Sequence, residues 1–93
     1  MSIKRTKSSG KLISSGLVLE QEGWLEAAIL TDGGTDAKVT FYDSANDDIG
    51  AALEIGFISE NVPVFDISSH AINGIYAEVE EGGEFIAFYS IGK

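Results

Sequence analysis

The chain has 93 residues, no cysteine and a formal charge of −9. A chain of this length forms one domain near the small end of what folds alone, and the lack of cysteine excludes disulfides and thiolate metal sites. No apolar run approaches the roughly 20 residues that span a bilayer, and no apolar segment follows the basic N-terminus, so we predict neither a membrane anchor nor a signal peptide.

The basic residues gather at the start of the chain. Residues 12–93 hold two basic and fifteen acidic side chains, a charge of about −13, whereas residues 1–11 contain four of the six basic residues: Lys4, Arg5, Lys7 and Lys11. Because residues 1–11 are polar and rich in Ser and Gly, we predict a flexible arm there and a single domain over residues 12–93. The arm is either a solvated terminus or a segment that reaches an acidic neighbouring subunit or another anionic surface. The acidic domain repels nucleic acid and anionic membranes, so neither is an expected partner.

Alternating apolar and polar residues predict strands in the first half of the chain. Residues 12–21 form an early strand, followed by residues 24–31, in which Leu25, Ala27 and Ile29 share a face, and by residues 37–43. The turn between the last two is Asp-Gly-Gly-Thr-Asp, and glycines of this kind supply the positive φ of tight hairpin turns. The sequence therefore predicts a β-hairpin over residues 24–43.

The second half repeats this pattern. Residues 52–58 place Leu53, Ile55 and Phe57 on one face, and residues 62–67 begin beside Pro63, which suits the start of a strand or a sheet edge. Residues 74–80 and 84–91 flank Glu-Gly-Gly and predict a second hairpin. The segment 84–91 is apolar on both faces, so it is either central in a sandwich or covered by a second chain.

Seven or eight short strands result, with room for at most one helical turn near residues 45–53. Evenly spaced strands separated by Gly, Asn, Asp and Ser are typical of all-β proteins. We therefore predict a small antiparallel β-sandwich of Greek-key or jelly-roll type.

Residues with catalytic potential are few. The one histidine, His70, lies near Ser68, Ser69 and Asp66, but a surface histidine explains the same pattern, and neither a nucleophile elbow nor a zinc-protease motif is present. Four glutamates crowd the second Gly-Gly turn, where they face water rather than a cleft. We predict that the protein is not an enzyme and has no cofactor.

The loop after residue 42 is rich in oxygen ligands. A calcium site there would use Asp43, Asn46, Asp47 and Asp48, but the EF-hand spacing is absent, and a turn built by Asx side chains explains the same residues. The main expectation is a turn without metal, and calcium remains the alternative.

Three aromatic residues, Trp24, Tyr42 and Tyr76, fall on the polar-looking faces of their strands. Such residues anchor a protein partner, stack on a sugar ring, or form the second side of the core. A nucleic-acid site is disfavoured because these strands carry almost no Lys or Arg.

The stretch GGTDAKVTFYDSA at residues 33–45 resembles a pattern in small β-rich virion proteins of tailed bacteriophages. The resemblance extends to NGIYAEV at residues 73–79 and to the Tyr-Ser pair at residues 89–90, and covers about residues 16–91. It implies a non-enzymatic head decoration or cement protein, located in the virion, bound as a homotrimer to the major capsid protein or other virion subunits. It implies no catalytic residues. The alternatives are a tail or baseplate subunit and a carbohydrate-binding or calcium-dependent adhesion module.

Overall fold

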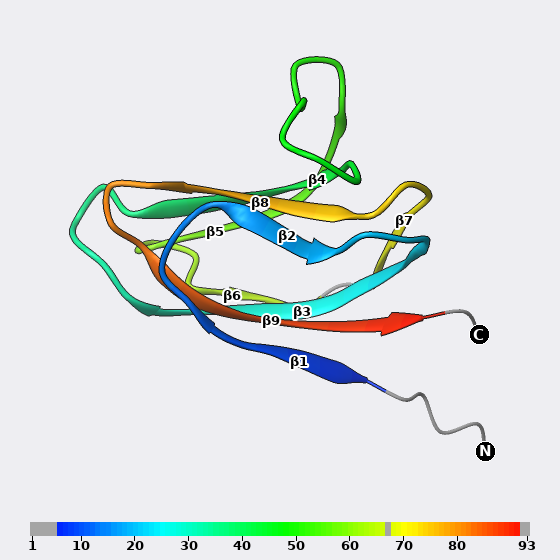
Figure 1. The fold of residues 1–93 in the computed structure, drawn as a ribbon. Helices are drawn as coiled ribbons and strands as arrows, with labels where there is room; N and C mark the ends of the chain where they lie inside the picture. The colour runs from blue at the N-terminus through cyan, green and yellow to red at the C-terminus, as the bar shows by residue number, and fades with distance from the viewer. Residues whose placement is uncertain (1–5, 67, 92–93) are drawn as a thin grey trace.

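The computed structural model describes residues 6–66 and 68–91 and is all-β, which confirms the predicted β-sandwich. Two antiparallel sheets pack against each other (Figure 1). The described residues form nine strands: β1 (Lys7–Leu12), β2 (Gly16–Leu19), β3 (Gly23–Asp32), β4 (Lys38–Asp43), β5 (Leu53–Ser59), β6 (Val64–Phe65), β7 (Ser69–Ala71), β8 (Ile75–Glu80) and β9 (Glu84–Ile91).

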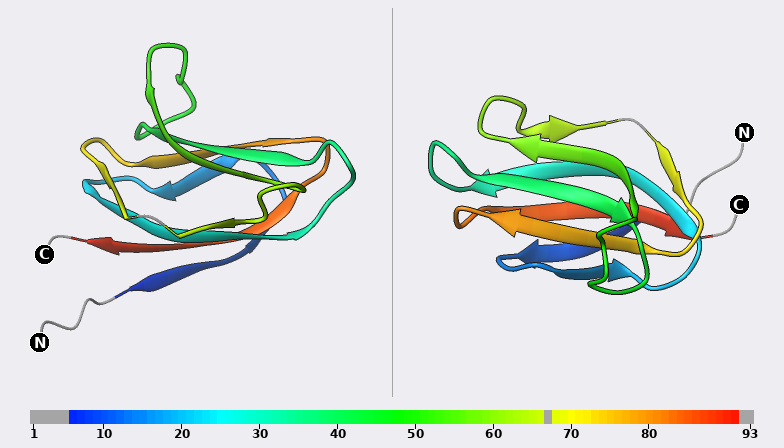
Figure 2. Two further views of the ribbon diagram at one scale, coloured as in Figure 1. Left: turned by 180° about the vertical axis from the view of Figure 1, so that it is seen from behind. Right: turned by 90° about the horizontal axis from the view of Figure 1, so that it is seen from above.

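The two sheets divide the strands without regard to their order in the chain. Sheet A has the order β1-β9-β3-β6, with β7 also paired to β3, and sheet B has the order β2-β8-β4-β5. Figure 2 shows the two layers from behind and from above. The strand β9, apolar on both faces, lies between β1 and β3, and the packing of sheet A on sheet B buries one of those faces, on which Phe85 and Ala87 lie.

The core lies between the sheets and is built from both. Phe41 on β4 and Phe85 on β9 meet edge-to-face, with ring centroids 5.6 Å apart. Both rings are fully buried, and such aromatic pairs add about 0.5–1.5 kcal/mol to their burial. The other large, fully buried side chains are Leu25, Val39, Ile58 and Ile75.

Both predicted Gly-Gly hairpins are wrong, because each turn carries the chain from one sheet to the other. Residues 33–37 connect β3 of sheet A to β4 of sheet B, and residues 81–83 connect β8 of sheet B to β9 of sheet A. The two crossings lie together at one end of the sandwich, on the left in Figure 1. A Cβ on Gly33 would lie 3.4 Å from Gly83 Cα and 2.4 Å from Ala37 Cβ, so the close approach needs glycine at position 33.

Two predicted strand faces are also corrected. A bulge between Leu25 and Ala27 shifts the alternation of β3, so that Ala28 is buried and Ile29 lies on the outer face. An irregularity opposite Phe41 does the same for β5, in which Phe57 is exposed and Ile58 is buried. An inserted residue changes which side chains face the core without changing the composition of the strand.

The predicted arm is corrected over its second half. Lys7–Leu12 form β1, an edge strand of sheet A that pairs with β9, while Lys4 and Arg5 lie outside the described residues. The expected strand over residues 12–21 is the end of β1 followed by β2. Pro63 lies just before the short strand β6, and its carbonyl accepts a hydrogen bond from the Leu30 N–H at 2.8 Å.

Candidate functional site

The outer face of sheet B combines aromatic and acidic side chains. One row of cross-strand partners runs from β2 through β8 and β4 to β5 and consists of Leu17, Tyr76, Tyr42 and Glu54. Tyr76 and Tyr42 alternate with buried residues of β8 and β4, and their partners Leu17 and Glu54 are exposed, so the row points away from the core. Neighbouring rows add six further outward side chains, and we call the whole set the acidic aromatic face: Leu17, Lys38, Thr40, Tyr42, Glu54, Phe57, Ser59, Tyr76, Glu78 and Glu80.

Electrostatics on this face are dominated by carboxylates. The Tyr42 hydroxyl donates a hydrogen bond to Glu78 Oε1 at 3.3 Å. Partial burial and the negative charge of Glu78 raise the pKa of Tyr42, and Glu54 and Glu80 act in the same direction. The amine of Lys38 lies 5.2 Å from the centroid of the Phe57 ring, within the range of a cation–π contact.

The outer face of sheet A is apolar at its centre. Val64, Ile29 and Ile86 are cross-strand partners on β6, β3 and β9, and Ala27 and Phe88 form the next pair. Val64 is 54% exposed and Ile29 is 38% exposed, while the other three are half-buried. We call these five residues the apolar face.

His70 lies at one end of the same sheet. Its ring stacks on Trp24, with centroids 4.5 Å apart and planes 23° apart, and its Nε2 lies 2.7 Å from Glu22 Oε2. The histidine is therefore held by Trp24 and Glu22, which the sequence did not suggest, rather than by Ser68, Ser69 or Asp66.

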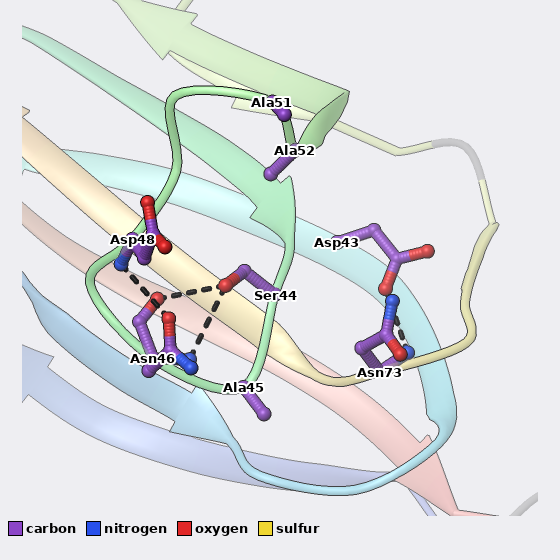
Figure 3. Close-up of a pocket in the computed structure, with 8 residues that line it drawn as sticks. All are labelled: Asp43, Ser44, Ala45, Asn46, Asp48, Ala51, Ala52 and Asn73. Carbon is purple, nitrogen blue, oxygen red and sulfur yellow. Dashed lines mark hydrogen bonds between the residues drawn. The ribbon is translucent and has the colours of Figure 1, made fainter.

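The acidic loop joins β4 to β5 and surrounds a shallow pocket (Figure 3). Asn46 Oδ1 accepts a hydrogen bond from the Asp48 N–H at 2.9 Å, and Asp43 Oδ1 accepts one from the Asn73 N–H at 2.7 Å. Ser44 Oγ donates to the Asn46 carbonyl at 2.8 Å. The candidate calcium oxygens of Asn46 and Asp43 thus accept hydrogen bonds from backbone N–H groups, of the loop in the first case and of Asn73 in the second. In residues 6–66 and 68–91, no three His, Cys, Asp or Glu residues gather as metal ligands would.

The predicted binding residues do not form one site. Trp24 lies on sheet A, whereas Tyr42 and Tyr76 face each other across β4 and β8 on sheet B. Lys7 and Lys11 lie on β1, where the Lys11 amine is 3.7 Å from Glu84 Oε1. A sugar or calcium site shared by Trp24, Tyr42 and the acidic loop is therefore not assembled.

The sequence did not predict the apolar row of Val64, Ile29 and Ile86. It also did not predict that Glu54 and Phe57 lie on the outer face of sheet B. The signal for the apolar row was the segment 84–91, whose apolar residues occur on both faces. The other residues follow only from strand order and from the irregularity in β5.

Comparisons with protein-family models, with curated proteins and with solved structures found no match. Among the residues that the structure describes, none belongs to a helix with the length and apolar character of a membrane span.

Proposed function

We propose that the chain is a non-enzymatic structural protein of a bacteriophage virion, which decorates the assembled head and stabilises it. The observation that carries the proposal is the apolar face of sheet A. Val64, Ile29 and Ile86 form a row across three neighbouring strands, with Ala27 and Phe88 beside it. Contiguous apolar side chains on an outer surface mark protein–protein interaction sites, whereas scattered ones do not.

The apolar face would work by burial against a protein surface. Completely burying a Val or Ile side chain is worth about 1.5–3 kcal/mol, so covering the 54% and 38% that Val64 and Ile29 expose contributes about 1 kcal/mol each. The resemblance to small virion proteins supplies the partner, which is the major capsid protein or another virion subunit. A ligand that binds only the assembled shell stabilises it by mass action, by about 2.7 kcal/mol at a concentration 100 times its Kd.

The test replaces the exposed apolar residues with polar ones of similar shape. We expect the double variant I29T/V64T to bind heads of the phage that encodes the chain at least about tenfold more weakly than the unaltered protein, measured by co-sedimentation. The matched control is L53T/I72T, which changes two apolar residues that are 69% and 66% exposed and lie off the apolar face. Threonine keeps the β-branched shape of Ile29, Val64 and Ile72 and is itself favoured in strands such as that of Leu53, so both proteins should fold.

Unchanged binding by I29T/V64T would refute a role for this face, and binding to isolated tails rather than heads would place the protein in the tail or baseplate. Failure of the unaltered protein to bind any virion part would refute the proposed function.

A further inference from the structure

We propose that the acidic aromatic face of sheet B binds the basic N-terminal segment, residues 1–7, of a second copy of the chain. This contact uses the sheet opposite the apolar face, and it does not depend on the proposed function.

The face has the chemistry of a cation-binding surface. It carries Glu54, Glu78 and Glu80 against the single amine of Lys38, beside the rings of Tyr42, Tyr76 and Phe57. The Lys38 amine already lies over the Phe57 ring. Partial burial raises the pKa of Tyr42, and the negative charges of Glu78, Glu54 and Glu80 raise it further. Aromatic rings beside carboxylates attract Lys and Arg both through the ring faces and through ion pairs.

The chain itself supplies a cationic partner. Lys4, Arg5 and Lys7 lie within the first seven residues, which hold no acidic side chain, whereas residues 12–93 carry a charge of about −13. Two copies that approach through their acidic domains repel each other. A contact between the basic segment of one copy and the acidic aromatic face of the next is the arrangement that turns this repulsion into attraction.

Chain reach favours a second copy over the same copy. Lys7 lies on β1 in sheet A, and Lys4, three residues earlier, can lie no more than about 10 Å from it in an extended chain. The acidic aromatic face is the outer surface of sheet B. To reach it from β1, the segment of the same copy must cross the spacing of about 10 Å between packed sheets and then pass around the edge strand β2. Figure 1 shows β1 on the side of the sandwich opposite β4 and β8.

The contact joins two different surfaces, so it is heterologous and builds a closed ring or an open chain of subunits.

The experiment measures self-association by sedimentation velocity over a range of protein concentrations. We expect the unaltered protein to associate in 50 mM NaCl, and its association constant to fall at least about tenfold in 500 mM NaCl, because salt screens exposed charges. The variants K4E/R5E and E54K/E80K should each weaken association at least about tenfold. The matched control is D36K/E60K, which makes the same change in charge at two exposed positions in turns and should associate normally.

Mixing the two charge-reversed variants gives the decisive result. K4E/R5E keeps an intact face and E54K/E80K keeps an intact basic segment, and the acidic segment of the first variant also complements the basic face of the second. The mixture should therefore associate into a pair of about 20 kDa or into larger alternating complexes, from copies of 9.9 kDa. A mixture that remains monomeric overturns the proposal. It is also overturned if the unaltered protein stays monomeric at every concentration in low salt, or if I29T/V64T abolishes association while E54K/E80K leaves it intact. Since binding to heads is measured separately, either proposal can fail alone.

Discussion

Replacing Gly74 with alanine tests the packing at the end of the sandwich that carries Tyr42 and Tyr76. Gly74 has a φ of +150°, and a Cβ there would lie 2.6 Å from the Leu19 carbonyl oxygen and 2.9 Å from that of Ser44. Backbone strain of this kind costs about 1–3 kcal/mol, and moving packed atoms aside costs about 1–3 kcal/mol more. The sum is about 2–6 kcal/mol, a large part of the roughly 5–15 kcal/mol that keeps a domain folded.

Calorimetry or circular dichroism measures the effect as a melting temperature. For a domain of this size about 1 kcal/mol corresponds to about 4–8 °C, so G74A should melt about 10–50 °C below the unaltered protein. G82A is the first control, because Gly82 has a φ of +72° but nothing within 4 Å of the added Cβ, so it suffers strain alone. G34A is the second, because Gly34 has neither a positive φ nor a close neighbour, and it should melt near the unaltered protein. Equal melting temperatures for G74A and G82A would refute the argument from close contacts.

Three further predictions concern the core, the outer face of sheet B and the acidic loop. F85A should lose about 3–5 kcal/mol of stability in denaturant unfolding, because it leaves a cavity beside the Phe41 ring, whereas F57A, at a residue 39% exposed, should lose much less. The pKa of Tyr42 is raised in the folded protein, so its contribution to stability is complete below pH 10.0, the unperturbed tyrosine value, and is lost as the pH rises through the folded pKa. E78Q should lower the pKa of Tyr42 measured by NMR, and an unchanged pKa would contradict the role of the Glu78 charge. Calcium and EDTA should leave the melting temperature unchanged, because the Asn46 and Asp43 oxygens already accept hydrogen bonds from backbone groups of the loop and of Asn73. A melting temperature that rises with calcium would contradict this and support the metal site.

The period-two pattern was sufficient to predict the β-sandwich and the approximate positions of its longer strands. It was not sufficient to predict pairing, because two alternating segments joined by Gly-Gly look alike whether they share a sheet or face each other across the core. Contacts between residues far apart in the sequence decide which strands pair. Gly83, for example, lies where an added Cβ would be 3.5 Å from both Leu30 and Val39, which come from opposite sheets.

The candidate surfaces were only partly predictable for the same reason. Trp24, Tyr42 and Tyr76 were predicted on the polar-looking faces of their strands, with core, protein interface and sugar contact all left open, and their distribution over two sheets depends on strand order. The apolar row depends on the bulge in β3, which turns Ile29 outward and Ala28 inward. Nothing in the composition of residues 23–32 marks the position of that bulge.

The crossings between the sheets also bear on how the chain folds. Among the described strands, only β4 and β5 are both consecutive in the chain and paired in a sheet. Nearly every other pairing closes a long loop, as when Lys7 pairs with Tyr89, and such topologies fold in milliseconds to seconds rather than microseconds. Because β9 lies between β1 and β3, sheet A cannot close until residues 84–91 take their place. Until then β1 has no neighbour in the sheet, and Lys7 at its start can contact another molecule.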